Sequence, residues 1–450
     1  MQNSCQVRIV VVNFDGGDLT LACLKALVAD QYSDLSTQIV LVDNGSLDNV
    51  VDTTRAKWPE IEVIEPLENL GFGGGCNLGI QLPGSFDYVA LVNPDAAVEP
   101  GWLQPMVKKL ESDSALGAAS PKMLFAGEKA IINLNIPDAG TLGDEDTREL
   151  GVRLVDFRLN SDGKFIDGSP ILGAGWYGYE SPIGEEKIAV WSKKDASLLV
   201  SIEGLESPEA EIQVKRNEPA SLFLESADQK IQIQVGSEPV WVKVDLSGAD
   251  IDVVQNAGSQ IHPGGHGGDR GFREIDNGQF DEAEEMFAWC GGAVLLRPDY
   301  LKDVGVFDEK MFLYYEDFDL SWRGQLKEWK YCYVPSAVVR HHHAQSTGEW
   351  SPLFRFYVDR NRLLVLVKNG PAKVTLIETA RAHAVFFKIL IKDFFVPLLK
   401  FRIPKQQEVK HQIRYLLSFW KQFPAALRHR LKAKNLKNRS FTYESGLGSR

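Results

Sequence analysis

The sequence predicts an α/β protein with a mainly parallel sheet, an inserted all-β domain and a helical C-terminal region. Three observations support this fold class. In the first 125 residues, short apolar runs alternate with helical patterns, which indicates βαβ units. Over residues 125–251 helical periodicity gives way to short alternating runs, separated by Gly, Pro, Asp and Ser at roughly the 8–12-residue interval of a sandwich. Beyond residue 370, apolar and basic residues recur at helical spacing.

These changes of pattern divide the chain into three parts. We expect a discontinuous α/β domain over residues 1–125 and 252–370, a β-sandwich-like insert over 126–251, and a basic amphipathic helical region over 371–450. The insert contains no catalytic motif, so we expect it to fold separately and to supply no catalytic group. Its aromatic residues form either a sugar-stacking platform or a sandwich core, and both readings stay open: Trp176, Tyr177, Tyr179, Trp191 and Trp241.

Cysteine usage and the N-terminal sequence indicate the compartment. The five cysteines are scattered and form no CxxC pair, which argues against a disulfide framework and a zinc site. The N-terminus has no signal-peptide pattern, and no run of about 20 apolar residues predicts a spanning helix. We therefore expect a cytoplasmic protein in a reducing environment.

The net charge of −12 is unevenly distributed along the chain. Residues 381–439 contain 15 Lys and Arg against two acids, so a basic end follows an acidic body. At helical spacing, one broad apolar face lies opposite Lys388, Lys392 and Lys400, and Pro397 should kink or divide the helix. We expect peripheral contact with the inner face of the plasma membrane and no nucleic-acid partner. Packing of the same face on the catalytic domain or on a second subunit in a homo-oligomer is the alternative. The face contains Phe386, Phe387, Leu390, Ile391, Phe394, Leu398 and Phe401.

Polar corners follow the predicted strands of the first domain. We expect strands over residues 7–13, 38–42, 61–65 and 88–92. The strand over residues 88–92 ends at Asn93, because Pro94 has no backbone N–H to donate to a neighbouring strand. Asp95 therefore lies just beyond the carboxyl end of this strand. Ligands of open α/β sheets bind outside the carboxyl ends of the strands, so Asp95 is a candidate for contact with a metal or a sugar phosphate. A simple Asx turn is the alternative.

The glycine stretch NLGFGGGCNLG (69–79) follows the third strand. Its glycines would let the backbone approach a phosphate at a helix N-terminus. It lacks the GKS/T ending of a Walker loop and the spacing of a dinucleotide fingerprint. A flexible turn without ligand is the alternative.

Acidic residues and histidines that could act in catalysis or metal binding are concentrated in residues 311–326 and 341–343. Glu316, Asp317 and Asp319 stand at the start of a helical pattern, where N-cap duty explains Asp319. After a strand over residues 331–340 come three adjacent histidines, beginning with His341. One imidazole, one carboxylate and substrate oxygens would suit Mn²⁺ or Mg²⁺, whereas surface histidines without a ligand are the alternative.

The order and spacing of these motifs resemble glycosyltransferase family 2, most closely its rhamnosyltransferase-like bacterial members. The resemblance covers residues 7–125 and 252–370, and not the insert. It is carried by Asn13, VDNGS (42–46), NLGFGGGCNLG (69–79), VNPD (92–95), GGA (291–293), FDE (307–309), YEDFDL (315–320) and VRH (339–341).

The resemblance implies a GT-A fold and inverting transfer from a nucleotide diphospho-sugar to a glycan or lipid-linked glycan in cell-surface polysaccharide synthesis. Asp317 would be the catalytic base, with Glu316 as its rival, and Asp95 and His341 would hold Mn²⁺ or Mg²⁺. The first acid of the family's DxD motif is Asn93 here, which places strict metal dependence in question. The implied donor-side residues are Asn13, Asp43, Asn44, Gly71, Gly73, Asn77, Asn93 and Asp95, and we expect Trp289 and Gly291 on the acceptor side.

Two other classes share some of these features. A sugar-nucleotide nucleotidyltransferase would normally carry a basic glycine-rich loop near the N-terminus, where this chain has the acidic FDGGD (14–18). A non-catalytic glycan-binding protein would account for the insert and its aromatics, but not for acids and histidine at separate strand ends.

Overall fold

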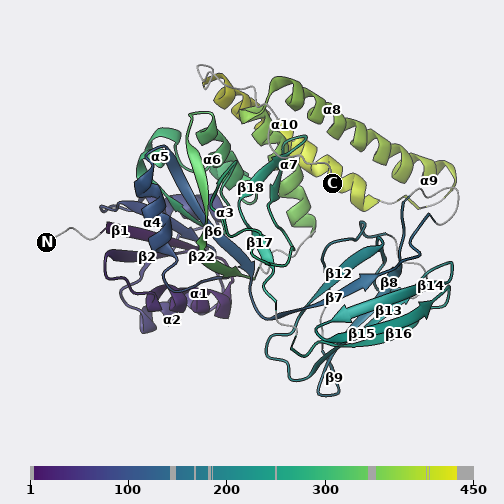
Figure 1. The fold of residues 1–450 in the computed structure, drawn as a ribbon. Coiled ribbons are helices and arrows are strands. Elements are labelled where there is room, and N and C mark those ends of the chain that lie inside the picture. The colour runs from purple at the N-terminus through teal and green to yellow at the C-terminus, as the bar shows by residue number, and fades with distance from the viewer. Residues whose placement is uncertain are drawn as a thin grey trace. The chain divides into compact units, whose positions relative to one another are not determined.

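The computed structural model describes residues 5–141, 148–166, 169–180, 184, 186–248, 251–342, 351–401, 403–404 and 406–432. The chain divides into two compact units (Figure 1). Unit 1 contains Met1–Met123, Asn256–Arg270 and Phe280–Arg450, and unit 2 contains Leu124–Gln255 and Gly271–Gln279.

Unit 1 is built on a mixed sheet whose first half is parallel. Its strands lie in the order β3-β2-β1-β4, and β1 pairs in register with β2 so that Asn13 lies beside Asp43. Apolar runs buried on both faces form β4, most of β1 and the second half of β2, as is typical of parallel strands, whereas the edge strand β3 is partly exposed. The bounds are β1 Cys5–Asn13, β2 Leu35–Asp43, β3 Glu62–Ile64 and β4 Tyr88–Val92, with helices α1 Gly17–Ala29, α2 Val50–Lys57 and α3 Gly71–Gln81.

The second half of this sheet is antiparallel where β21 joins it. β21 pairs antiparallel with both β4 and β6. The apolar pattern FAWCGGAVLLR (287–297) is typical of a strand. The strand β21 is shorter than this pattern, because the Gly291 N–H donates to Asp317 and the Gly292 carbonyl accepts from Asn93. The elements are β5 Ala96–Val98, α4 Leu103–Ser112, β6 Leu116–Phe125, β20 Glu284–Met286, β21 Ala293–Leu296, α5 Pro298–Val304, the 3-10 turn η1 Glu309–Met311, α6 Glu316–Gln325 and β22 Lys330–His341.

A short hairpin precedes β20 in the chain. The composition of residues 261–271, rich in glycine and histidine, is typical of a loop. The structure instead forms antiparallel strands here, β18 (Ser259–His262) and β19 (His266–Asp269), after the short β17 (Val254–Asn256). Gly267 N donates to Tyr315 Oη at 3.1 Å, and Arg362 Nη1 donates to Gly264 O at 2.6 Å. These bonds fix the hairpin beside the start of α6.

Unit 2 consists of two antiparallel sheets around an aliphatic core (Figure 1). One has the order β10-β12-β7-β14-β15, and the other has β11-β8-β13-β16 with β9 beside β8. Inward residues alternate with outward ones, which matches the period of two in the sequence. The bounds are β7 Lys129–Asn135, β8 Arg153–Ser161, β9 Lys164–Ile166, β10 Ile171–Leu172, β11 Val190–Trp191, β12 Asp195–Ser201, β13 Pro208–Lys215, β14 Ala220–Ser226, β15 Gln229–Val235 and β16 Val240–Asp245.

The aromatic residues named in the insert do not share one surface. Trp191 is buried, and Trp176 donates its indole N–H to Ser197 O at 2.6 Å. The guanidinium of Arg158 covers Trp241 at 4.1 Å from the ring centroid. Trp176, Trp191 and Trp241 therefore make contacts within unit 2, whereas Tyr179 is exposed.

The C-terminal part of unit 1 is helical, with α7 and α10 side by side (Figure 1). Phe419 on α10 is fully buried with Leu363 and Leu364 on α7, so α10 packs on α7. Pro397 lies in a helical turn, and the irregularity precedes it as a π-helical turn. The bounds are α7 Pro352–Asn369, α8 Ala372–Ile389, η2 Leu390–Phe395, α9 Val396–Leu399 and α10 Gln406–Lys432.

Candidate active site

The ends of β1 and β2 form the first corner of the candidate site. Asn13 Nδ2 donates to Asp43 Oδ1 at 2.8 Å and to Ser46 Oγ at 2.9 Å. Asp43 Oδ2 accepts from Ser46 N at 3.1 Å, and Asn13 Oδ1 accepts from Thr20 Oγ1 at 2.7 Å. Asn13 is fully buried and Asp43 nearly so. Asn13 is therefore a buried support for Asp43.

The helix α3 is attached to this corner through its first residue. Asn44 Nδ2 donates to Gly71 O at 2.9 Å, and Gly71 has φ +72°, a conformation that glycine adopts without strain. The glycines do not form a loop, since α3 already begins at Gly71. A Cβ on Gly75 would lie 2.6 Å from Val12 Cγ1, and one on Gly73 would touch Phe307. Close helix packing therefore explains most of this glycine stretch.

The end of β4 meets the end of β22. Asp95 Oδ1 lies 2.9 Å from His341 Nε2, and Asn93 Nδ2 lies 3.2 Å from the same nitrogen. Burial alone would raise the pKa of Asp95, but the hydrogen bond and charge of His341 outweigh it and lower the pKa. The carboxylate is therefore ionised at neutral pH. His342 follows β22, and His343 lies outside the described residues.

Two backbone hydrogen bonds connect this corner to the start of α6. Asn93 N donates to Gly292 O at 2.9 Å, and Gly291 N donates to Asp317 Oδ2 at 2.8 Å. Asp317 Oδ1 accepts from the Phe318 N–H at 2.7 Å. Hydrogen bonds thus connect the Asp317 carboxylate to the corner that contains Asp95 and His341.

The two acids at the start of α6 have different surroundings. Glu316 is buried, and its Oε2 has no hydrogen-bond partner among the described residues, whereas Asp317 is partly exposed. Burial, and then the charge of Asp317, raise the pKa of Glu316 to about 8. Burial also raises the pKa of Asp317, against two backbone N–H donors that lower it, and the nearby Asp269 adds to the rise. Asp317 is the acid that a substrate can reach.

Residues 8–137 match the family model described as glycosyl transferase family 2. This segment of the chain is therefore similar to glycosyltransferase family 2. The matched segment contains the Asn13–Asp43 corner, α3 and Asp95, so the family-2 signature coincides with the first half of the site.

Curated relatives match a shorter segment. The N-acetylglucosaminyl-diphospho-decaprenol L-rhamnosyltransferases of Mycobacterium tuberculosis strains CDC 1551 / Oshkosh and ATCC 25618 / H37Rv are each 44% identical over 71 residues, which is 16% of this chain. The chain spans 23% of the length of these relatives.

Two solved structures are similar at low sequence identity. A crystal structure of GalNAc-T7 with UDP, GalNAc and Mn²⁺ has a TM-score of 0.46 at 11% identity, over 97% of this chain and 59% of that chain. The mannosyltransferase PcManGT from Pyrobaculum calidifontis in complex with GDP-Man and Mn²⁺ has a TM-score of 0.39 at 11% identity, over 93% and 86%.

Asp95 and His341 offer a carboxylate oxygen and an imidazole nitrogen, which are donor types that a divalent ion can take. In this structure the two atoms are 2.9 Å apart, which is the distance of a direct hydrogen bond. No group of three or more His, Cys, Asp or Glu among the described residues could hold a metal. An ion bound here would therefore take its remaining ligands from water and a diphosphate, as Mg²⁺ commonly does.

Asn77 and Trp289 make buried contacts with Phe307. Asn77 is buried, donates to Phe307 O at 3.1 Å and accepts from Phe307 N at 3.0 Å. Trp289 is fully buried edge-on to the same Phe307 ring, so it cannot face an acceptor. Gly291 contacts the site directly, because its backbone N–H donates to Asp317 Oδ2. The sequence could not separate buried contacts from ligand contacts, because amide and indole groups suit both.

Asp319 is not an N-cap. Its carboxylate is fully buried and accepts from Arg323 Nε at 2.9 Å, Lys368 Nζ at 2.7 Å and Asn369 Nδ2 at 2.8 Å. Burial alone would raise the pKa of Asp319, but the charges of Lys368 and Arg323 lower it well below its usual range. The i,i+4 spacing of Asp319 and Arg323 was visible in the sequence, whereas the contribution of α7 was not.

Asp269 is the residue that the sequence analysis missed. It lies at the end of β19 and accepts from Asn256 Nδ2 at 2.5 Å, and its charge acts on Asp317. The glycines and histidines around it obscured it, because they are typical of a loop.

Proposed function

We propose that this protein is an inverting glycosyltransferase that moves a sugar from a nucleotide diphospho-sugar to a glycan or lipid-linked glycan acceptor. The observation that carries the proposal is the continuous path from Asp317 through Gly291, Gly292 and Asn93 to the Asp95–His341 pair. It supports one centre with a base at one end and a diphosphate-holding corner at the other.

The proposed chemistry follows from the demands of a single displacement. As the acceptor oxygen attacks the anomeric carbon, its proton must go to a base, and Asp317 supplies a partly exposed carboxylate with a raised pKa. The Gly291 N–H orients this carboxylate at 2.8 Å. Mn²⁺ or Mg²⁺ at Asp95 and His341 would neutralise the charge of the departing diphosphate. We place the donor between that pair and the Asp43 corner, as in a GT-A fold.

The names of the partial relatives indicate a donor sugar and an acceptor. The partial relatives are named as L-rhamnosyltransferases that act on a decaprenol-linked diphospho-N-acetylglucosamine. We infer rhamnose as donor sugar and a lipid-linked glycan as acceptor, in cell-surface polysaccharide synthesis.

The second half of the proposal is peripheral contact with an anionic membrane through α8, η2 and α9. Phe387, Ile391, Leu398 and Phe401 are exposed, whereas Phe386 packs on α7 and α10. Lys388, Lys392 and Lys400 are exposed along the same elements, which suits anionic lipid headgroups. Among the described helices, none has the length and apolar content needed to cross a bilayer. Part of the basic run, including Lys434 and Arg439, lies outside the described residues.

The test is the variant Asp317→Asn. The amide keeps the shape of the side chain but cannot take the proton, so donor binding should persist while transfer falls by about 10²–10⁴-fold. The matched control is Glu316→Gln, which should retain most activity because Glu316 is buried. Products are identified after incubation with a panel of nucleotide sugars.

Each product has a separate meaning. Nucleoside diphosphate release supports the transferase. Pyrophosphate would favour the nucleotidyltransferase alternative, and no turnover in any panel member would favour a binding protein. Near-normal transfer by Asp317→Asn together with loss in Glu316→Gln would move the base to Glu316.

A further inference from the structure

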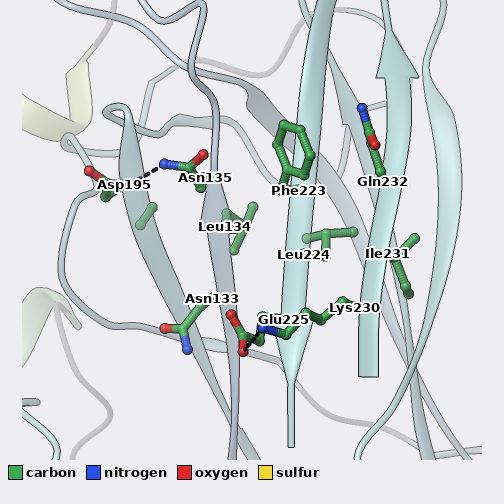
Figure 2. Close-up of a pocket in the computed structure, with 11 residues that line it drawn as sticks. Asn133, Leu134, Asn135, Asp195, Phe223, Leu224, Glu225, Lys230, Ile231 and Gln232 are labelled. Atoms are coloured by element: carbon green, nitrogen blue, oxygen red, sulfur yellow. Dashed lines mark hydrogen bonds and ion pairs between the residues drawn. The ribbon is translucent and has the colours of Figure 1, made fainter. Parts of the chain in front are cut away.

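One sheet of unit 2 carries a hollow on its outward face that the proposed transfer centre does not use. The hollow has a volume of about 710 Å³ and lies over β12, β7, β14 and β15 (Figure 2). All of its lining residues belong to unit 2.

Strand register arranges the outward side chains in two rows across the sheet. Asn135 pairs with Asp195 on one side and Phe223 on the other, and Phe223 pairs with Gln232. One step along the strands, Glu225 pairs with Asn133 and Lys230. Figure 2 shows these side chains along the hollow. The rows are Asp195, Asn135, Phe223 and Gln232, and then Asn133, Glu225 and Lys230.

The alternate residues of the same strands anchor these rows. Leu134 and Leu224 point to the opposite side and are buried in the aliphatic core of unit 2. Side chains along a strand alternate between faces, so a fixed core row fixes the outward row. The spacing of the outward groups is therefore set before a ligand arrives.

The chemistry of the hollow combines one aromatic ring with amides. Phe223 is 38% exposed, a large fraction for a ring in mid-strand. Asn135 donates to Asp195 at 2.5 Å, while the side chains of Asn133 and Gln232 make no hydrogen bond to a described residue. An amide offers donors and an acceptor together, which matches the hydroxyls of a sugar. An exposed ring offers an apolar surface for the C–H face of a pyranose.

The charged and polar side chains of the hollow disfavour two other classes of ligand, which are anionic ligands and apolar ones. Lys230 forms an ion pair with Glu225 at 3.2 Å, and Asp195 adds a further acid, so a phosphate or an acidic polymer would be repelled. The apolar lining is interrupted by polar groups in both rows, which suits neither a lipid nor a hydrophobic helix.

We propose that this face of unit 2 binds a neutral oligosaccharide, with one sugar ring on Phe223 and its hydroxyls bonded by Asn133, Asn135 and Gln232. This site is separate from the transfer centre and goes beyond the proposed function. A protein that elongates a glycan would gain from it, because a chain held at a second site raises its local concentration.

Affinity electrophoresis of the full-length protein tests this site without relying on activity. Native gels contain a neutral galactan, a mannan or a rhamnan, and a fourth gel contains dextran sulfate. We expect at least one neutral polymer to retard the protein and dextran sulfate to leave it unretarded. Phe223→Ala should weaken the apparent affinity by at least about tenfold, as expected for loss of a stacked ring.

A matched control comes from the other sheet. Phe165 on β9 is 62% exposed, so Phe165→Ala removes a comparable ring and should leave retardation unchanged. Equal melting temperatures of both variants and wild type exclude a folding effect. The proposal is overturned if no neutral polymer retards the wild type, if Phe223→Ala migrates like wild type, or if dextran sulfate alone retards the protein. Donor turnover is measured separately, so either proposal can fail without the other.

Discussion

The ionisation of Asp317, at the start of α6, should determine how the rate of sugar transfer depends on pH. Asp317 must be ionised to accept a proton, and its pKa is raised, so transfer should increase with pH through that pKa. The charge of Asp269 contributes to the rise. Asp269→Asn should therefore shift the acidic limb of the kcat/KM profile to lower pH, without changing its shape. The pH dependence of kcat/KM for both proteins checks this, and an unshifted limb would show that Asp269 does not act on Asp317.

Glu316 should make the protein less stable as pH rises. Its folded pKa of about 8 lies above its ordinary value of 4.5, so between these values the unfolded chain has lost a proton that the folded chain retains. Stability then falls with pH by about 1.4 kcal/mol per pH unit. Glu316→Gln removes this loss, so its advantage over wild type should grow from pH 5 to pH 8. Thermal melts across this range provide the measurement, and a constant difference would contradict the assignment.

The sequence indicated which residues lie near the candidate site, but it did not indicate which of them are buried. Asp317, Asp95 and His341 follow from their positions at element ends, and hydrogen bonds place them in one site. Asn77 and Trp289 were assigned to ligands because the sequence does not report burial. Their side chains could bind a sugar or close a gap in the core with equal chemical ease.

At the scale of elements, the network around Asp319 joins α6 to α7. Lys368 on α7 donates to Asp319 at 2.7 Å and to Asp308 at 2.8 Å, and its side chain is 3% exposed. Lys368→Met should destabilise the protein by about 1.5–3 kcal/mol, because the buried Asp319 carboxylate loses one of its two cationic partners and keeps Arg323. Urea unfolding followed by fluorescence measures the effect.

A surface ion pair supplies the comparison for this prediction. Arg55 and Glu65 form a pair with both side chains about half exposed. Arg55→Met should cost only about 0–1 kcal/mol. Similar losses for the two variants would mean that the α6–α7 network contributes little beyond an ordinary surface pair.

Elements with strong periodicity were predictable, and those determined by distant partners were not. The runs at 7–13 and 88–92 became β1 and β4 with small differences at the ends. The glycine stretch became the first turns of α3, because β1 and Phe312 supply the packing that favours a helix there. The hairpin β18–β19 also depends on distant contacts, which no local pattern reveals.

At the scale of the whole molecule, the apolar row on α8, η2 and α9 predicts lipid binding. The full-length protein should sediment with vesicles of phosphatidylglycerol and phosphatidylcholine at low salt, and less at high salt. Combined Phe387→Ser, Ile391→Ser and Leu398→Ser changes should reduce binding more than tenfold, since burial of each such side chain contributes about 1.5–3 kcal/mol.

Exposed leucines elsewhere provide the control for lipid binding. Leu47 and Leu67 are almost fully exposed in the first part of unit 1, so Leu47→Ser with Leu67→Ser should leave vesicle binding intact. Absence of binding by wild type at low salt would contradict the membrane proposal. Equal loss in both sets of variants would indicate nonspecific adsorption.

The two ends of the insert lie side by side. Phe125 N donates to Val253 O at 2.9 Å, so the chain leaves and returns at one point. While unit 2 is folded, it keeps the flanking strands β6 and β17 close together, so the rest of the protein does not have to close a long flexible loop. If it unfolds, the rest of the protein must close a loop of the 132 residues from Leu124 to Gln255. By loop-closure entropy this costs about 4 kcal/mol. Unfolding of unit 2 therefore lowers the stability of unit 1, even where no side chain in unit 1 changes.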